Sequence, residues 1–423
     1  MLTLLSKSSE IYKNSHLTSS QRGEGLAERT QGSVFFYTFV KETAKNSMLL
    51  LSGPNISGNE WKYVKDCLDT GWVSSVGTYV EKFEKMTAEF TGAKFAVATS
   101  SGTTALHICL ILNDIQRDDY VIAPNVTFVA SINAIKYTNA DPILIDVDEH
   151  TWQMDLDLLE KFLSGETEIK NDNSIYKKDG RKIKAIMLVH VLGNMCNMDQ
   201  LLHISKKYNL IVIEDATEAL GSYYKNKHAG TFGLMGTFSY NGNKIITTGG
   251  GGMIITDNEA LAKKAKHITT QAKSDPFEYM HDEIGYNYRL VNTAAAMGVG
   301  QMELLPEFLK RKREIIAFYK KELEEVGDIS FQKIDHDVNP NWWLPTIMTE
   351  KQKQVLKILN ENKMQSRPFW VPMNKLPMFK NNLYYTKDDR SDYIYQKCLS
   401  IPCSTNISDD ELASVVLKIK EVY

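Results

Sequence analysis

The segment from about residue 92 to residue 256 alternates short apolar runs with helix-like stretches, and this alternation limits the possible folds most strongly. The apolar runs are 95–99, 120–124, 142–146, 184–190, 210–215, 237–240 and 252–256. They are continuous, as is typical of parallel strands that are covered on both faces. Between them lie helix-like stretches such as TTALHICLILN and ASINAIKYTN. This order predicts an α/β fold with a mostly parallel, seven-stranded sheet.

The sequence changes in character on both sides of this segment. Residues 1–48 are predicted to form a partly irregular N-terminal arm, with a short amphipathic helix at about 34–46. We expect the large domain to span residues 49–300 and a smaller C-terminal α+β domain to span residues 301–423.

Two helices of the smaller domain have clear sequence signals. Apolar residues recur at helical spacing over 304–326, and Pro306 is expected in the first turn, where its missing N–H costs nothing. The last stretch, 408–422, is expected to begin with a capping box formed by Ser408 and Glu411.

Composition and charge exclude several classes of protein. The chain has 423 residues, of which 43% are hydrophobic and 24% charged, so it is not a disordered protein. A formal net charge of −3 gives no basic surface for nucleic acid. Five scattered cysteines without a CxxC pair argue against a metal site and for a reducing compartment. Because no apolar run reaches the ~20 residues of a membrane helix, we expect a cytoplasmic enzyme that does not span a membrane.

A glycine run provides the first candidate for a functional site. In SYNGNKIITTGGGGMIIT, Gly249–Gly252 precede an apolar strand, and Lys244 lies five residues before them. Glycines allow positive φ angles and close backbone approach to a bulky group. A tight turn between two strands, with a solvated lysine, explains the same residues.

The second candidate is the end of the apolar run in IVIEDATEALG. Glu214 and Asp215 end this predicted strand, and ligands of open parallel sheets bind where strands end. An acid at this position can bind a metal, a ribose or a protonated ring nitrogen. Alternatively, Asp215 and Glu218 form a capping box at the start of a helix.

Two further candidates lie at other predicted strand ends. Gly102 and Thr103, in SSGTTALH, would open a helix whose free N–H groups suit a phosphate, although Ser101 or Thr103 could simply cap that helix. Phe128, in PNVTFVAS, could stack on a planar ligand or lie in the core.

Together, these candidates provide the groups that pyridoxal 5′-phosphate (PLP) requires. PLP needs a phosphate anchor, a stacking ring, a carboxylate that keeps the pyridine nitrogen protonated, and a lysine for the aldehyde. No P-loop motif is present, which disfavours an ATPase.

The sequence also resembles that of a known family. From about residue 50 to 423 it is similar to the sugar aminotransferases of the DegT/DnrJ/EryC1/StrS family, which are fold-type I PLP-dependent transferases. The matching stretches are SGTTALH, PNVTFVASINAIKY, DPILIDVD, VHVLGNMCNMD, VIEDATEALGSYYKNKHAGTFG, TFSYNGNKIITTGGGGM and GYNYRLVNTAAAMGVGQ.

The resemblance implies a role for each candidate residue. Lys244 would be the Schiff-base lysine, Asp215 the partner of the ring nitrogen and Phe128 the stacking aromatic. Glu218 would lie beside the pyridine hydroxyl. The implied phosphate contacts are Gly102, Thr103 and Ser239.

The resemblance also implies an obligate homodimer with shared sites. Asn287 matches an asparagine that reaches the phosphate from the neighbouring subunit, although on its own it would be taken for a turn residue. Arg367 is a candidate sugar contact. The sequence differs from many relatives at Gly250, where they have glutamate, and near Asn374, where they have histidine.

The stretch PNISGNEWKYVKDCLDTGWVSSVGTYVEKFE is most similar to the LegC-type subgroup. This similarity implies transfer of an amino group from an amino acid, with L-glutamate expected, to the 4-keto group of UDP-4-keto-6-deoxy-N-acetylglucosamine in nucleotide-sugar and polysaccharide or glycan biosynthesis. A GDP-4-keto-6-deoxymannose aminotransferase of the perosamine synthase type is an alternative.

Two other functions are open to the same fold. A PLP-dependent sugar dehydratase would have histidine in place of Lys244. A ligand-binding descendant without enzymatic activity would be expected to lack Lys244 or Asp215, and both are present.

Overall fold

The computed structural model describes residues 48–275 and 277–423. The helix expected at 34–46 and nearly all of the expected N-terminal arm lie outside these residues. Leu49–Tyr423 form one compact unit. The expected domain boundary at residue 300 falls inside helix α10 (Asn292–Leu323), and the division into a large and a small domain stays a prediction.

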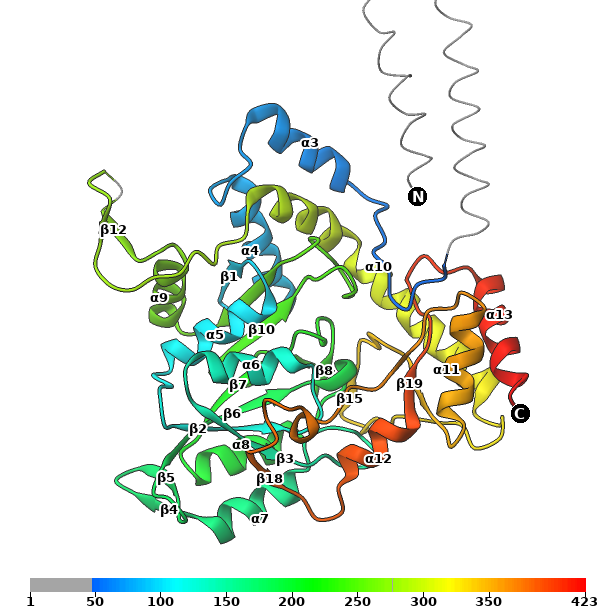
Figure 1. Cartoon of the computed structure of the whole chain (residues 1–423). Coiled ribbons are helices and arrows are strands. Elements are labelled where there is room, and N and C mark those ends of the chain that lie inside the picture. The colour runs from blue at the N-terminus through cyan, green and yellow to red at the C-terminus, as the bar shows by residue number, and fades with distance from the viewer. Residues whose placement is uncertain (1–47, 276) are drawn as a thin grey trace, which may run out of the picture. The chain divides into compact units, whose positions relative to one another are not determined.

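A mixed sheet of ten described strands forms the centre of this unit. Its main order is β1-β11-β10-β7-β6-β2-β3-β18 (Figure 1). All seven predicted strands belong to it: β1 (Phe95–Thr99), β2 (Tyr120–Pro124), β3 (Asp141–Ile145), β6 (Lys182–Val189), β7 (Ile211–Asp215), β10 (Met235–Ser239) and β11 (Gly252–Thr256). Among these seven, β11 runs antiparallel to its two neighbours, β1 and β10, and all other pairs are parallel, so the prediction of a mostly parallel α/β sheet is confirmed.

Three strands extend the sheet beyond the prediction. They are β4 (Thr167–Lys170), β5 (Asn173–Tyr176) and β18 (Leu383–Tyr385). β18 pairs in parallel with β3, so a segment from near the C-terminus completes the edge of the central sheet. This strand has only three residues, and all three are half-buried, so it is too short and too exposed to produce a sequence pattern.

Helices cover both faces of the central sheet (Figure 1). On one face lie α5 (Gly102–Leu112), α6 (Val129–Tyr137) and α9 (Glu259–Thr269), which share a core cluster with Ile213 and Met187. On the other face lie α4 (Thr78–Thr91), α7 (Leu156–Glu166), α8 (Met198–Lys207) and α10, which share a cluster with Ile122 and Ile186. The continuous apolar strands are therefore buried on both faces.

Helix α10 begins much earlier than predicted. It starts at Asn292, so Pro306 lies in the helix interior, and the prediction that it occupies the first turn is wrong. The early part of α10 is rich in glycine and alanine because other elements pack closely on it. A Cβ at Gly298 would lie 2.8 Å from the ring of Phe83, and one at Gly300 would lie 2.8 Å from the backbone of Glu60. Small residues at this contact hide the apolar periodicity.

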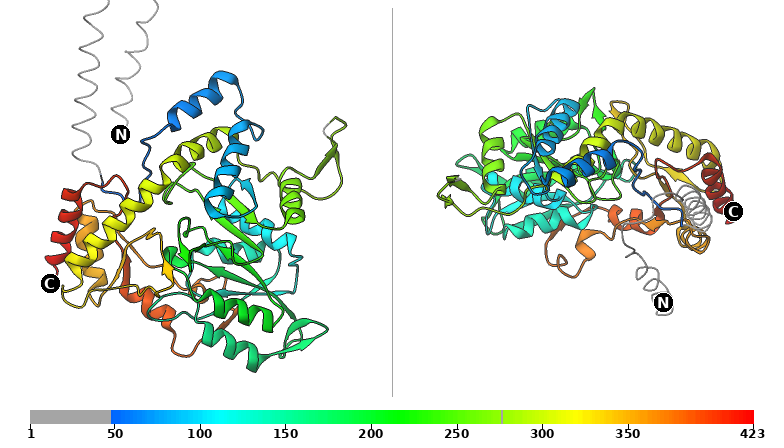
Figure 2. Two further views of the ribbon diagram at one scale, coloured as in Figure 1. Left: turned by 180° about the vertical axis from the view of Figure 1, so that it is seen from behind. Right: turned by 90° about the horizontal axis from the view of Figure 1, so that it is seen from above.

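The remaining C-terminal elements form a layer around a small sheet. Its strands are β14 (Ser330–Phe331), β16 (Thr346–Met348), β19 (Cys398–Ser400) and β17 (Arg367–Pro368), and the neighbouring helices are α11 (Gln352–Glu361), α12 (Arg390–Lys397) and α13 (Asp409–Lys420). Helix α10 runs from α3 (Glu60–Thr70) and α4 to α13 (Figures 1 and 2). The predicted capping box at Ser408 and Glu411 is confirmed.

Two smaller sheets lie outside these layers. The first contains β15 (Val338–Asn339), β8 (Tyr223–Tyr224) and β9 (Lys227–His228). The second is a hairpin of β12 (Lys273–Asp275) and β13 (Met280–His281), which extends outwards beyond α9 in all views (Figures 1 and 2). In the part of the chain that the structure describes, no helix is long and apolar enough to cross a membrane.

Candidate active site

A cavity of about 460 Å³ lies at the edge of the central sheet where the parallel strands end. This is the position at which open α/β sheets bind their ligands. The predicted site residues that line it are Gly102, Thr103, Phe128, Asp215, Glu218, Ser239, Lys244 and Arg367. The fold thus brings together residues that are up to 265 positions apart in the sequence, from Gly102 to Arg367.

Asp215 ends β7 and presents a buried carboxylate to the cavity. Its Oδ2 accepts a hydrogen bond from Ser131 Oγ (2.6 Å), and its Oδ1 accepts one from the Thr217 N–H (3.2 Å). Turns rather than a helix follow β7, so the alternative in which Asp215 and Glu218 cap a helix is excluded. The carboxylate is held by two donors and is available to a ligand in the cavity.

Lys244 and Glu218 form a buried pair beside Asp215. Lys244 Nζ lies 3.8 Å from Glu218 Oε1. Burial lowers the pKa of the Lys244 amine, while the carboxylates of Glu218 and Asp215 act in the opposite direction. Burial raises the pKa of Glu218, and Lys244 opposes that change. Burial therefore shifts the pKa values of the two groups toward each other.

A strained turn holds Glu218 in place. Leu192 adopts a φ of +59°, in the left-handed region that favours glycine, and its N–H donates to Glu218 Oε2 (2.8 Å). Gly193 follows with a φ of +82°, and a Cβ there would overlap the side chain of Asn341. Asn341 Nδ2 in turn donates to the Glu218 carbonyl (2.8 Å). The turn and Asn341 together fix both the backbone and the carboxylate of Glu218.

Trp343 is a site residue that sequence reasoning missed. Its ring lies under the Lys244 amine, with Nζ 3.8 Å from the ring centroid, and its Nε1 donates to the Asn243 carbonyl (2.7 Å). Trp370 stacks on it at 6.4 Å and also lines the cavity. Both tryptophans come from C-terminal loops without periodic pattern, so no local signal pointed to them.

The N-terminus of α5 forms one wall of the cavity. Ser101 caps this helix in a capping box with Thr104, so the capping alternative holds for Ser101. Gly102 and Thr103 occupy the first helical positions, where backbone N–H groups have no partner within the helix. A Cβ at Gly102 would lie 2.9 Å from Ser239 Cβ, so glycine permits the close approach of these two walls. This arrangement suits a phosphate group.

Phe128 lies at the cavity wall immediately before α6 and is 54% exposed. The alternative in which it is a core aromatic is therefore excluded. A half-exposed ring beside a buried carboxylate can stack on a planar ligand.

The glycine run provides the positive φ angle and the close backbone approach that were expected of it. Gly249 has a φ of +79°, in the left-handed region that favours glycine, and Gly250 and Gly251 line the cavity. The alternative of a tight turn with a solvated lysine is wrong, because residues 240–251 connect β10 to β11 and the Lys244 side chain is only 13% exposed. A Cβ at Gly252 would overlap the carbonyl oxygen of Ser101. The close approach that Gly252 permits is therefore between β11 and the start of α5.

Arg367 lies on β17 of the small C-terminal sheet and lines the cavity. It is exposed, and its Nη1 donates to the Ser366 carbonyl (3.0 Å). Asn374 pairs with Asn125 through two hydrogen bonds of 2.9 Å. In this chain Asn374 therefore fastens a C-terminal loop to the end of β2.

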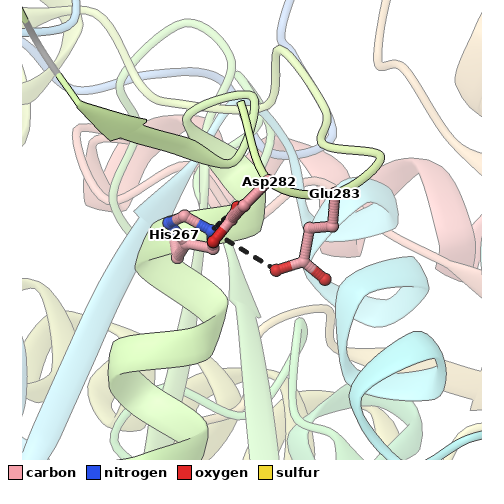
Figure 3. A group of neighbouring side chains, drawn as sticks. All are labelled: His267, Asp282 and Glu283. Carbon is pink, nitrogen blue, oxygen red and sulfur yellow. Dashed lines mark hydrogen bonds and ion pairs between the residues drawn. The ribbon is translucent and has the colours of Figure 1, made fainter. Parts of the chain in front are cut away.

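Asn287 is exposed, and among the described residues it is not one of those that line the cavity. It follows the β12–β13 hairpin, whose base is fastened to α9. His267 Nε2 lies 2.7 Å from Asp282 Oδ1 and 3.3 Å from Glu283 Oε1 (Figure 3). Lys264 also pairs with Glu283. These four exposed or half-exposed groups form a network of polar contacts that orients the segment carrying Asn287.

The residues of the cavity fit PLP. A buried carboxylate, an amine whose side chain is 13% exposed, a half-exposed ring and a helix N-terminus surround a single space, and they match the nitrogen, aldehyde, ring face and phosphate of PLP respectively. Gly102 and Ser239 form a cradle that a larger residue at position 102 would fill.

Comparison with known proteins agrees with this geometry. Residues 54–420 match the profile of the DegT/DnrJ/EryC1/StrS aminotransferase family. The chain is 38% identical to the GDP-perosamine synthase of Escherichia coli O157:H7, over 88% of this chain and 97% of the relative. It is 30% identical to the UDP-4-amino-4,6-dideoxy-N-acetyl-beta-L-altrosamine transaminase of Campylobacter jejuni, over 89% of this chain and 100% of the relative.

Solved structures have the same fold. The PLP form of the putative sugar aminotransferase Spr1654 from Streptococcus pneumoniae matches with a TM-score of 0.79 and 22% identity, over 89% of this chain and 98% of that one. The predicted fold class, cofactor and enzyme class are thus confirmed. The chain belongs to the DegT/DnrJ/EryC1/StrS aminotransferase family and is a PLP-dependent aminotransferase.

Proposed function

We propose that this enzyme transfers an amino group from an amino acid, L-glutamate in the first instance, to the 4-keto group of a nucleotide-linked 4-keto-6-deoxysugar. The observation that carries the proposal is the position of the Lys244 amine. It lies in one cavity with the Asp215 carboxylate and with Arg367. The cavity therefore joins the cofactor residues to a cationic group suited to an anionic substrate.

Some cavity residues bind the cofactor, and others hold or transfer protons. PLP, when bound, supplies the electron-accepting ring that carries the amino group between donor and acceptor. The α5 N-terminus and Ser239 bind the phosphate, and Phe128 stacks on the ring. Asp215 holds a proton at the ring nitrogen. Lys244 is the group that links to the cofactor and then moves protons at the substrate carbon.

The sugar nucleotide is the finer part of the proposal. The GDP-perosamine synthase relative is 38% identical to this chain, whereas the relative named for a UDP-linked sugar is 30% identical. This difference favours GDP-4-keto-6-deoxymannose over the UDP-4-keto-6-deoxy-N-acetylglucosamine expected from the opening of the sequence. The presence of Lys244 in the cavity disfavours the dehydratase alternative.

A homodimer with shared sites is a further part of the proposal. The β12–β13 hairpin next to Asn287 exposes large apolar side chains, among them Phe277 (90% exposed) and Ile284 (85% exposed). Exposed apolar residues grouped in this way are typical of a surface that another chain covers. Asn287 would then reach the phosphate in the partner's cavity.

A panel of substrates tests the proposed function. Purified enzyme with PLP and L-glutamate is incubated separately with the UDP- and GDP-linked 4-keto-6-deoxysugars, and the products are identified by mass spectrometry. We expect the amino sugar from the GDP substrate at the higher kcat/KM. Product from the UDP substrate alone would reverse the preference. Absence of amino sugar from every member of the panel, with PLP bound, would contradict the proposed function.

A further inference from the structure

Lys244 and Trp343 are tied to each other by two separate contacts. The Lys244 Nζ lies 3.8 Å from the centroid of the Trp343 ring. At the edge of the ring, Trp343 Nε1 donates to the carbonyl of Asn243, the residue before Lys244 (2.7 Å). The indole therefore contacts both the amine and the backbone of the turn that carries it.

The Trp343 ring has little freedom to move. The Trp343 side chain is buried, the backbone N–H of Trp343 donates to Asn341 Oδ1 (2.9 Å), and its backbone carbonyl accepts from Lys312 Nζ (2.9 Å). Lys312 is itself buried in α10 and also donates to the Cys403 carbonyl (2.6 Å). Hydrogen bonds from Asn341 and from Lys312 of α10 thus fix the backbone that carries the ring.

We propose that Trp343 is a positioning residue that holds the Lys244 amine at the cavity wall, with the ring face on one side and the Glu218 carboxylate on the other. The face of an indole attracts an ammonium group, and the attraction is stronger where water is excluded. The ring therefore stabilises the protonated amine relative to the free base. The charged groups that face this amine are Glu218 and Asp215, and both act in the same direction as the ring.

The inference rests on the proposed function, in which Lys244 links to the cofactor. It adds that an aromatic residue from a C-terminal loop decides where the amine lies and at which pH it becomes nucleophilic. Trp343→Leu removes the π face but keeps the site apolar. Trp343→Phe keeps a weaker π face and loses the indole N–H. Trp370→Leu is the matched control, because it makes the same change in the same cavity at a ring that stacks on Trp343.

The test measures the pH dependence of the reaction of Lys244 with acetic anhydride in the full-length protein freed of PLP, with the modified peptide quantified by mass spectrometry. The midpoint should fall by about one pH unit in Trp343→Leu and by about half a unit in Trp343→Phe. It should stay at the wild-type value in Trp370→Leu. The rate at which added PLP is captured, followed by visible absorbance, should fall about tenfold in Trp343→Leu because the amine is less well placed.

The outcomes separate the inference from the proposed function. An unshifted midpoint in Trp343→Leu, with wild-type circular dichroism, would overturn the inference. If Trp343→Leu does not fold, Trp343→Phe decides, and an unshifted midpoint there would overturn it as well. An equal shift in Trp370→Leu would also overturn it, because the effect would then belong to the cavity as a whole. Borohydride-reduced PLP on a lysine other than Lys244 would instead refute the proposed function.

Discussion

Replacing Asp215 with asparagine is expected to separate cofactor binding from catalysis. The Asp215 carboxylate is 3% exposed, so water screens its charge very little. Opposite charges about 4 Å apart interact with about 4 kcal/mol at an effective dielectric constant of about 20. Removing a preorganised electrostatic contact from a transition state costs about 2.7–4 kcal/mol in measured cases. We therefore expect kcat to fall by about 10²- to 10³-fold.

Stopped-flow absorbance of the half-reaction with L-glutamate measures this effect, and release of PLP in alkali measures the bound cofactor. PLP content should stay near the wild-type value because the α5 N-terminus, Ser239 and Phe128 are unchanged. Ser131→Ala is the matched control: it removes one donor to Asp215 but keeps the charge, and should cost about tenfold or less. A half-reaction rate for Asp215→Asn within threefold of wild type would refute the assigned role.

The shared-site proposal predicts that mixing Asn287→Ala with Lys244→Ala chains restores activity, since each hybrid dimer has one site without either substitution. Native mass spectrometry confirms that hybrids form. Activity equal to the sum of the two parent enzymes would then rule the proposal out. Burial lowers the pKa of His228 to about 4, so the unfolded chain binds a proton between about pH 6.5 and pH 4 that the folded chain does not. The contribution of His228 to the unfolding free energy should therefore fall by about 2 kcal/mol from pH 7 to pH 5, and the difference in unfolding free energy between wild type and His228→Gln in urea titrations should change by that amount. Lys312→Met should lower the unfolding free energy by about 2–4 kcal/mol, because it leaves the carbonyls of Trp343 and Cys403 without their hydrogen-bond donor. A change below about 0.5 kcal/mol would contradict this role of Lys312, because the carbonyls would then have found other partners.

The sequence predicted the part of the fold that depends on continuous apolar runs. Each of the seven predicted strands lies in the central sheet, because burial on both faces leaves an uninterrupted run of apolar residues. It missed β18, since three half-buried residues carry no pattern. The start of α10 at Asn292 was missed because glycines such as Gly298 serve close helix contacts there and obscure the periodicity.

The residues of the candidate site also fall into those that have a local sequence signal and those that do not. Residues at strand ends, such as Asp215 and Phe128, could be predicted because the carboxyl ends of parallel strands meet at one edge. Trp343 and Leu192 could not, since their roles depend on a loop packing against Lys244 and on a left-handed turn beside Glu218. The position of Asn287 outside the chain's own cavity also depends on tertiary structure, and its role in a partner's site stays a prediction.

Borohydride reduction followed by peptide mapping tests the central claim most directly. The purified enzyme should absorb in the visible range with PLP bound and lose that absorbance on reduction. The mass of reduced PLP should then be found on the peptide that contains Lys244, the lysine whose amine lies in the cavity with Glu218 and Asp215. PLP on Lys225 or Lys227, which lie in and beside the β8–β9 turn, would contradict the account.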